Sequence, residues 1–79
     1  MTTSLVLFKY DSCPYCQKVM REITRLGLEK RVILRDTMRD PTAHQELLAK
    51  GGKTQVPCLL IDGLALYESD AIIRHLHTM

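Results

Sequence analysis

Two cysteines with two residues between them, in the stretch Cys13-Pro14-Tyr15-Cys16, are the residues best suited to chemistry in this chain. Pro14 fits the first position of a helix, where its missing N–H costs nothing, so we expect Cys13 at the exposed N-terminus of that helix and Cys16 about one turn inside. The partial positive charge of a helix N-terminus favours thiolate over thiol, and the thiolate is the attacking species in disulfide exchange. Cys13 is therefore the predicted nucleophile and Cys16 the resolving thiol.

Two other uses of the cysteine pair stay open on residue types alone. The pair could be buried structural thiols, or it could contribute to a zinc site, which usually takes four ligands. The chain has only one such pair, His75 and His77 are two apart on a predicted helix and point in different directions, and His44 is isolated. We expect no metal.

Composition indicates a compact domain over residues 1–79, with 46% hydrophobic and 25% charged residues. The net charge is only +2 and the basic residues are dispersed, so no polybasic block indicates nucleic acid. The apolar run Leu5–Phe8 is too short for a signal-peptide core or a membrane span. The three cysteines do not suit a disulfide-stapled secreted fold, so we expect a cytoplasmic, reducing compartment. We also expect a monomer that has no membrane partner.

The elements that must position these residues follow from the hydrophobic pattern. The run Leu5–Phe8 predicts a central strand at about residues 4–10, buried on both faces. Helical spacing of apolar residues from Pro14 predicts a helix that Gly27 ends, and residues 32–34 predict a short buried strand. Asp40-Pro41 predicts the start of a second helix, which Gly51-Gly52 terminates.

The remaining third of the chain predicts a hairpin and a helix. Residues 56–61 and 64–67 flank Asp62-Gly63, a dipeptide that favours a tight turn between antiparallel strands. Ser69 is a plausible N-cap for a terminal helix. The order βαβαββα predicts an α/β fold with a mixed four-stranded sheet and helices on both faces. A CxxC at the exit of its first strand is typical of a thioredoxin-like fold.

Three further positions have both a structural and a functional interpretation. Pro57 suits the first residue of a strand, which needs no donor, and only the fold context would make its bond to Val56 cis. Glu68-Ser69-Asp70 suits helix capping, and the same geometry could hold a substrate carboxylate while Asp70 takes an amino group. Cys58 is expected to pack in the core, with a regulatory disulfide or glutathione adduct as the alternative.

Three motifs together resemble a dithiol glutaredoxin of the CPYC type over nearly the whole chain. They are Cys13-Pro14-Tyr15-Cys16, Thr54-Gln55-Val56-Pro57 and Tyr67-Glu68-Ser69-Asp70-Ala71-Ile72. The resemblance implies a thioredoxin fold that uses glutathione as co-substrate to reduce protein disulfides and glutathione-mixed disulfides. The glutathione-binding residues that it implies are Lys9, Tyr15, Gln55, Val56, Pro57, Glu68, Ser69 and Asp70.

Within this resemblance, Val56 would pair with the cysteinyl part of glutathione beside a cis Pro57, Ser69 and Asp70 would take the γ-glutamyl end, and Tyr15 would flank the sulfur. Many glutaredoxins have a basic residue three positions before the first cysteine, where this chain has Tyr10. Candidates for docking the glycine carboxylate are therefore Lys9, Arg39 and Lys53.

Alternative functions share parts of this pattern. A redoxin recycled by thioredoxin reductase has the CxxC without the glutathione site, and an iron–sulfur carrier would ligate a shared cluster through Cys13 and glutathione. The Tyr67-Glu68-Ser69 stretch also resembles the N-terminal domain of glutathione transferases. Because the chain ends at Met79, before the helical second domain of such enzymes, we expect a glutaredoxin rather than a transferase.

Overall fold

Seven elements follow one another in the order predicted from the hydrophobic pattern. The computed structural model describes residues 3–79, so the first two residues of the predicted 1–79 domain lie outside it. The elements are β1 (Leu5–Lys9), α1 (Pro14–Arg25), β2 (Val32–Asp36), α2 (Pro41–Gly51), β3 (Cys58–Ile61), β4 (Leu64–Tyr67) and α3 (Ser69–Leu76). The βαβαββα prediction is confirmed.

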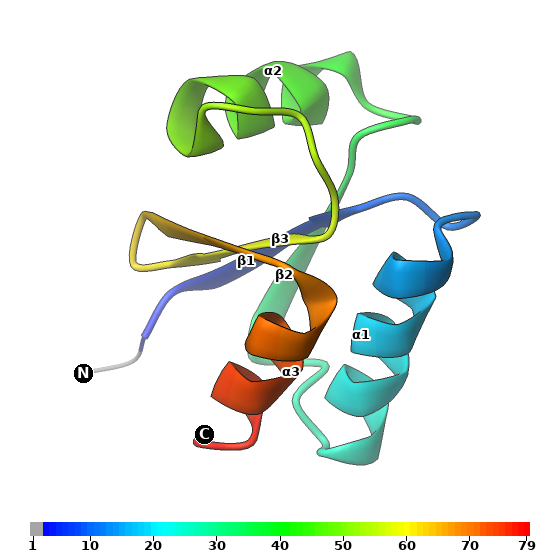
Figure 1. Cartoon of the computed structure of the whole chain (residues 1–79), viewed down its shortest axis with the longest axis vertical. Coiled ribbons are helices and arrows are strands. Elements are labelled where there is room, and N and C mark those ends of the chain that lie inside the picture. The colour runs from blue at the N-terminus through cyan, green and yellow to red at the C-terminus, as the bar shows by residue number, and fades with distance from the viewer. Residues whose placement is uncertain (1–2) are drawn as a thin grey trace.

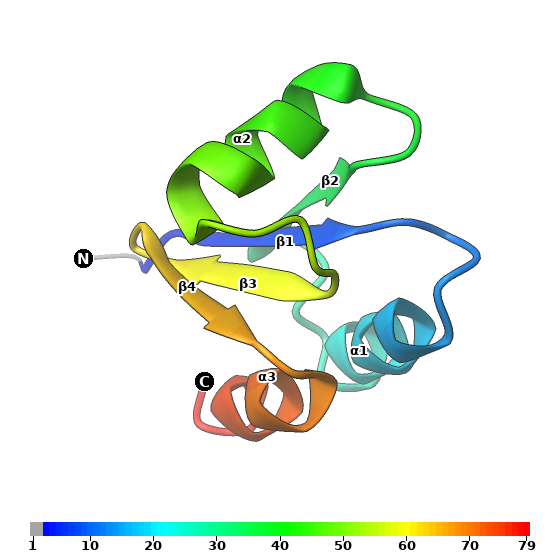
Figure 2. The same ribbon diagram turned by 45° about the horizontal axis from the view of Figure 1, so that its top comes forward.

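The four strands form one mixed sheet in the order β2-β1-β3-β4. Strand β1 pairs parallel with β2 and antiparallel with β3, which in turn pairs antiparallel with β4. As predicted, β1 is central. Helices α1 and α3 lie side by side on one face of the sheet and α2 covers the other (Figures 1 and 2).

The two faces of the sheet carry two separate groups of buried side chains. Successive residues of a strand point to opposite faces, so Leu5 and Leu7 contact α1 and α3 whereas Phe8 contacts α2. The larger cluster is Leu5, Leu7, Val19, Ile23, Val32, Leu59, Ile72 and Leu76. The smaller cluster is Phe8, Leu47, Cys58 and Leu60. The central strand therefore joins both halves of the core.

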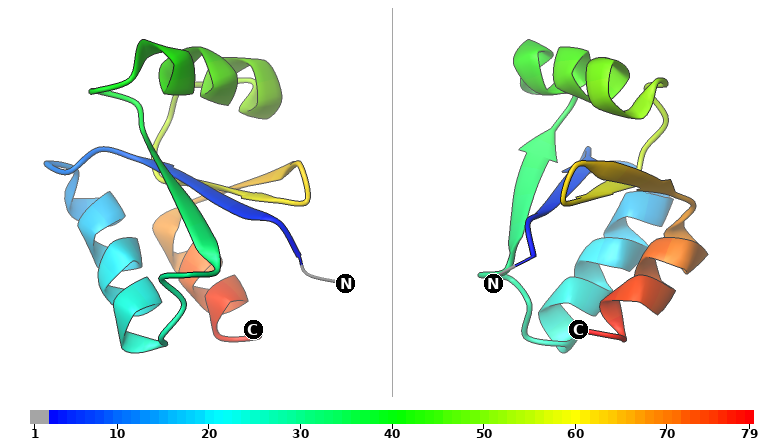
Figure 3. Two further views of the ribbon diagram at one scale, coloured as in Figure 1. Left: turned by 180° about the vertical axis from the view of Figure 1, so that it is seen from behind. Right: turned by 90° about the vertical axis from the view of Figure 1, so that its left-hand side faces the viewer.

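Strand β2 is less buried than its apolar sequence predicts. Val32 is buried, but Ile33 and Leu34 are 60% and 47% exposed, so the prediction of a buried run was wrong. The reason is position, because β2 is the edge strand next to β1 (Figure 3) and has a neighbouring strand on one side only.

Local signals account for most helix boundaries. The side chain of Asp40 caps α2 by accepting a hydrogen bond from the Thr42 N–H at 2.9 Å. Asp62 and Gly63 both have positive φ, as the predicted tight turn requires. One cap differs from the prediction, because Ser69 is the first residue of α3 and Glu68, at φ 75°, precedes it as N-cap. No helix within residues 3–79 is long and apolar enough to cross a membrane.

Candidate active site

The cysteine pair lies where β1 leads into α1, at the end of the central strand (Figure 2). Cys13 is the N-cap of α1 and Pro14 occupies its first turn, as the sequence predicts. The backbone N–H of Cys16 donates a hydrogen bond to Cys13 Sγ at 3.3 Å. Helix α1 thus directs one of its otherwise unpaired N–H groups at the sulfur of the predicted nucleophile.

The two thiols of the pair are free, and Cys13 is more enclosed than expected. Cys13 is only 4% exposed and Cys16 is fully buried, so the prediction of an exposed nucleophile was wrong. Burial, followed by the hydrogen bond with Cys13, raises the pKa of Cys16 to about 12. Cys16 is therefore a protonated thiol at neutral pH.

A groove beside the cysteine motif brings together seven of the eight residues predicted to bind glutathione. It has a volume of about 430 Å³ and we call it the Pro57 groove. Its lining residues are Tyr15, Gln55, Val56, Pro57, Glu68, Ser69 and Asp70. They come from the first turn of α1, the segment before β3 and the junction of β4 with α3, and the Val56–Pro57 peptide bond is cis.

Polar contacts define the α3 end of the Pro57 groove. The Gln55 side-chain amide donates to Glu68 Oε1 at 3.4 Å, across the groove from one segment to the other. The Lys18 ammonium contacts Asp70 Oδ1 at 2.9 Å, and this hydrogen bond, with the charge of Lys18, lowers the pKa of Asp70. The groove therefore ends at the ionised Asp70 carboxylate in the first turn of α3.

Lys9 is not among the residues that line the groove. Its ammonium is buried at the end of β1, 2.8 Å from Asp11 Oδ1 and 3.5 Å from Asp36 Oδ2. Burial opposes the charge, but Asp11 and then Asp36 outweigh it and raise the pKa of Lys9. An ammonium held by two carboxylates is poorly placed to dock a glycine carboxylate.

The other two basic candidates also have contacts outside the Pro57 groove. Arg39 pairs with Asp11 at 3.1 Å and with Asp36 at 3.9 Å, and it lines a separate cavity that shares no residue with the Pro57 groove. The Lys53 ammonium lies 4.5 Å from the centre of the Tyr67 ring. The structure thus brings none of the predicted cations to the groove wall.

Sequence reasoning missed Lys18 as a neighbour of the site. Its partner Asp70 is far away along the chain, and only the packing of α1 against α3 brings the two together. The prediction that the histidines are surface residues is confirmed for His44 and His77, which are exposed, whereas His75 is half-buried. In the described part of the chain, no three His, Cys, Asp or Glu side chains are grouped so that they could hold a metal ion.

A buried strand leading to a CxxC helix N-terminus, with a cis proline in the groove beside it, defines a domain of the thioredoxin-fold superfamily. Residues 7–78 match the family described as "Glutathione S-transferase, N-terminal domain". The chain belongs to this family.

Individual relatives include both glutaredoxins and transferases. Glutaredoxin-C1 of Arabidopsis thaliana is 32% identical over 71 residues, which are 89% of this chain and 57% of the relative. A glutaredoxin of Vernicia fordii is 35% identical over 63 residues, 78% of this chain and 61% of the relative. The chain thus spans about three fifths of the length of these curated relatives, and the predicted resemblance to glutaredoxins is confirmed.

Among solved structures, a glutathione transferase family member from Pseudomonas fluorescens Pf-5 with bound glutathione superposes with a TM-score of 0.80 at 32% identity. The match covers 95% of this chain and 38% of the transferase. The predicted second resemblance, to transferase N-terminal domains, is therefore also supported. The same domain occurs in that protein as part of a longer chain.

Proposed function

We propose that the protein is a glutathione-dependent thiol–disulfide oxidoreductase that reduces glutathione-mixed disulfides and protein disulfides. The observation that carries this proposal is the Pro57 groove, because seven side chains expected to bind glutathione line one groove beside the cysteine motif. The glutaredoxin relatives and the glutathione-bound transferase support it. The expected partners are glutathione and disulfide-bearing or glutathionylated proteins in a reducing compartment.

With a glutathione-mixed disulfide, the Cys13 thiolate attacks the glutathione sulfur held next to the Pro57 groove. A bond forms between Cys13 and glutathione, the old disulfide breaks, and the protein leaves as a thiolate that takes a proton from water. A second glutathione thiolate then attacks the glutathione sulfur on Cys13. Glutathione disulfide leaves and the Cys13 thiolate is restored, so this cycle does not need Cys16.

With a protein disulfide, Cys13 forms a mixed disulfide with the substrate and Cys16 completes the reaction. The buried Cys16 thiol must lose its proton before it attacks Cys13 Sγ, because its pKa of about 12 leaves almost no thiolate beforehand. The reduced protein leaves, and two glutathione molecules then reduce the Cys13–Cys16 disulfide. The enclosed position of Cys16 favours its reaction with Cys13 over reaction with other thiols.

Two single substitutions test this division of labour. Cys13→Ser should abolish turnover of a glutathione-mixed disulfide, measured through NADPH consumption by glutathione reductase. Cys16→Ser should retain much of that turnover, because glutathione itself resolves the intermediate. Cys58→Ser is the matched control for loss of a buried thiol elsewhere, in the smaller core cluster. Equal losses in the first two variants, or full activity in Cys13→Ser, would overturn the assignment.

A second candidate is transfer of glutathione to an electrophile, which the family match and the transferase structures favour. The Pro57 groove would hold glutathione in the same way, and the electrophile would replace the disulfide. Conjugation of 1-chloro-2,4-dinitrobenzene, measured beside mixed-disulfide reduction on the same preparation, separates the two activities. Conjugation without disulfide reduction would favour the transferase.

A further inference from the structure

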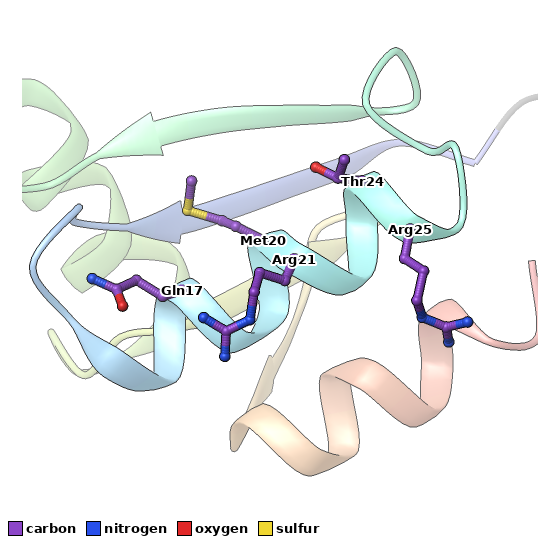
Figure 4. A pocket seen from close by; sticks show the side chains of 5 residues that line it. All are labelled: Gln17, Met20, Arg21, Thr24 and Arg25. Carbon is purple, nitrogen blue, oxygen red and sulfur yellow. The ribbon is translucent and has the colours of Figure 1, made fainter.

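A second hollow, apart from the Pro57 groove, follows the solvent side of α1. It is shallow and largely open to solvent, its exposed surface is mainly apolar although Met20 is the one apolar side chain in it, and we call it the α1 hollow (Figure 4). Its walls are formed by Gln17, Met20, Arg21, Thr24 and Arg25. None of these residues lines the Pro57 groove, so the proposed glutathione site does not account for the hollow.

The apolar surface of the α1 hollow continues to the edge of the sheet. Met20 and Thr24 also line a smaller cavity that reaches Leu34 on β2. Leu34 is 47% exposed, although leucine in a strand is commonly buried. The half-buried Met20 and the exposed Leu34 thus give this side of α1 a small apolar surface with polar residues around it.

The charges beside the hollow are cationic, and one of them is unpaired. Figure 4 shows Arg21 and Arg25 extending from the same side of α1. Arg25 is held by Glu22 through two bonds of 2.8 Å, whereas Arg21 is exposed and has no ion-pair partner within residues 3–79. An apolar hollow next to a free guanidinium complements an apolar side chain that has a carboxylate beside it.

The hollow begins close to the nucleophile. Gln17, at its near end, donates its backbone N–H to the Cys13 carbonyl at 2.9 Å. Arg21 lies one helical turn farther on, about 12 Å along α1 from Cys13 at a rise of 1.5 Å per residue. An extended peptide covers that distance in about three to four residues, at roughly 3.3 Å each.

We propose that the α1 hollow binds the protein half of the substrate. It selects segments in which a large apolar residue and an adjacent Asp or Glu lie three to four positions from the reactive cysteine. This inference rests on the proposed function: glutathione occupies the Pro57 groove, and the protein that leaves as a thiolate lies along α1. The two halves of a mixed disulfide would then contact different surfaces on either side of Cys13.

Three glutathionylated peptides test the selection. Each has one cysteine, followed at the third and fourth positions by Leu-Glu, Leu-Lys or Gln-Glu, with the rest of the sequence unchanged. The enzyme variants are wild type, Arg21→Glu and Arg31→Glu, the last making the same charge change at an exposed residue in the turn after α1. The measurement is kcat/KM for release of the peptide thiol.

Wild type should prefer Leu-Glu over Leu-Lys about threefold, the size of one exposed charge contact, and should also prefer it over Gln-Glu. Arg21→Glu should reverse the preference between the two charges, so that their ratio changes about tenfold, whereas Arg31→Glu should keep the wild-type order. Equal effects of the two charge reversals would overturn the proposal, because they would indicate a general effect of net charge.

A binding measurement separates this proposal from the proposed function. The Leu-Glu peptide with serine in place of cysteine is titrated into the reduced protein and followed by amide NMR shifts. Shifts concentrated at Gln17, Arg21 and Thr24 support the α1 hollow even if turnover of every disulfide fails. Shifts elsewhere, with normal turnover of a small glutathione-mixed disulfide, would overturn the hollow and leave the proposed function intact.

Discussion

The two thiols of the active-site pair differ in what surrounds them. Cys13 Sγ accepts a backbone N–H at the start of α1, whereas Cys16 is fully buried with a pKa raised to about 12. Because alkylation requires the thiolate, iodoacetamide at pH 7.5 should modify Cys13 in the folded, reduced protein and leave Cys16 unmodified. Mass spectrometry of tryptic peptides measures the two sites separately.

The control for this labelling is Cys16→Ser, which should take up the same single equivalent of reagent as wild type. Burial also raises the pKa of Cys58, so this thiol should react only after unfolding in guanidinium chloride. Comparable modification of Cys16 and Cys13 in the folded protein would contradict the asymmetry.

A substitution of Asp70 tests whether glutathione binds at the α3 end of the Pro57 groove. Its carboxylate is kept ionised by Lys18, and it is expected to receive the amino group of the γ-glutamyl residue. Asp70→Asn should raise the KM for glutathione by about twofold to fivefold with a smaller change in kcat, as expected for loss of one exposed charge contact. Asp62→Asn, in the β3–β4 turn, is the matched control.

Residue types predicted the position of Cys13 at the start of α1 and the residues that line the Pro57 groove, but they predicted the charged contacts poorly. Cys13 and Pro57 have local signals, a helix start and a strand start, so their surroundings can be inferred from neighbours in sequence. Lys9 carries no such signal, because its two carboxylate partners belong to a loop and to another strand. Only the folded chain shows that its ammonium is already neutralised.

At the scale of elements, the end of α2 contacts the sheet through a glycine. A methyl group on Gly51 would overlap the Tyr67 hydroxyl, which is held by donating to the Lys53 carbonyl at 2.9 Å. Gly51→Ala should therefore lower the free energy of unfolding by about 1–3 kcal/mol, although alanine normally favours a helix over glycine. Chemical denaturation followed by circular dichroism measures the change.

Tyr67→Phe provides the matched background for this prediction. Removing the hydroxyl removes most of the overlap, so Gly51→Ala should be much less destabilising in the Tyr67→Phe protein than in wild type. If the alanine has the same effect in both backgrounds, the contact between α2 and β4 does not explain the glycine.

The sequence of β2 does not indicate that this strand lies at the edge of the sheet. The apolar run of β2 is like that of a central strand, and periodicity alone does not tell which strand lies at the border of a sheet. The residues of β1 have the same kind of run and are buried because β1 has neighbours on both sides. Strand order comes from the right-handed crossover and the hairpin, which are properties of the whole chain.

At the scale of the whole molecule, Glu22 joins α1 to the C-terminal end of α3. Hydrogen bonds from Arg25 and then His77 lower its pKa from 4.5 to about 2. A carboxyl group with a depressed folded-state pKa stabilises the fold above its ordinary pKa and loses that contribution as the pH falls. The urea concentration at the midpoint of unfolding of wild type should therefore decrease as the pH is lowered from about 4.5 to 2.

The pH experiment is compared with Glu22→Gln, which should show a flatter decline over the same window. Other carboxyl groups with lowered pKa values, Asp36 and Asp70, add to the slope in both proteins, so the difference between the two curves isolates Glu22. Glu29→Gln, at an exposed carboxylate in the α1–β2 connection, is the control and should keep the wild-type slope. Identical slopes in all three proteins would contradict the prediction.

The overall fold could be predicted because its three motifs occur at element boundaries. The cysteine motif follows β1, Pro57 precedes β3, and Glu68 precedes α3, so one arrangement of strands brings all three to the same end of the sheet. A short chain of this size buries only a little over ~60% of the surface of its unfolded form, which leaves few alternative cores. The approach of α1 to α3 and the α1 hollow could not be predicted from the sequence, because both depend on how the helices pack in the folded chain.

The near-complete burial of Cys13 limits which disulfides the proposed enzyme can reach. Attack requires Cys13 Sγ and the two sulfurs of the substrate disulfide to lie nearly in line. A substrate sulfur that is enclosed by a rigid protein surface cannot reach this position beside an enclosed nucleophile. A tripeptide such as glutathione has no folded surface around its sulfur and can meet this requirement. A protein cysteine meets it only on a protruding or locally unfolded segment. The proposed enzyme would therefore act preferentially on substrate proteins that are unfolded around the reactive cysteine.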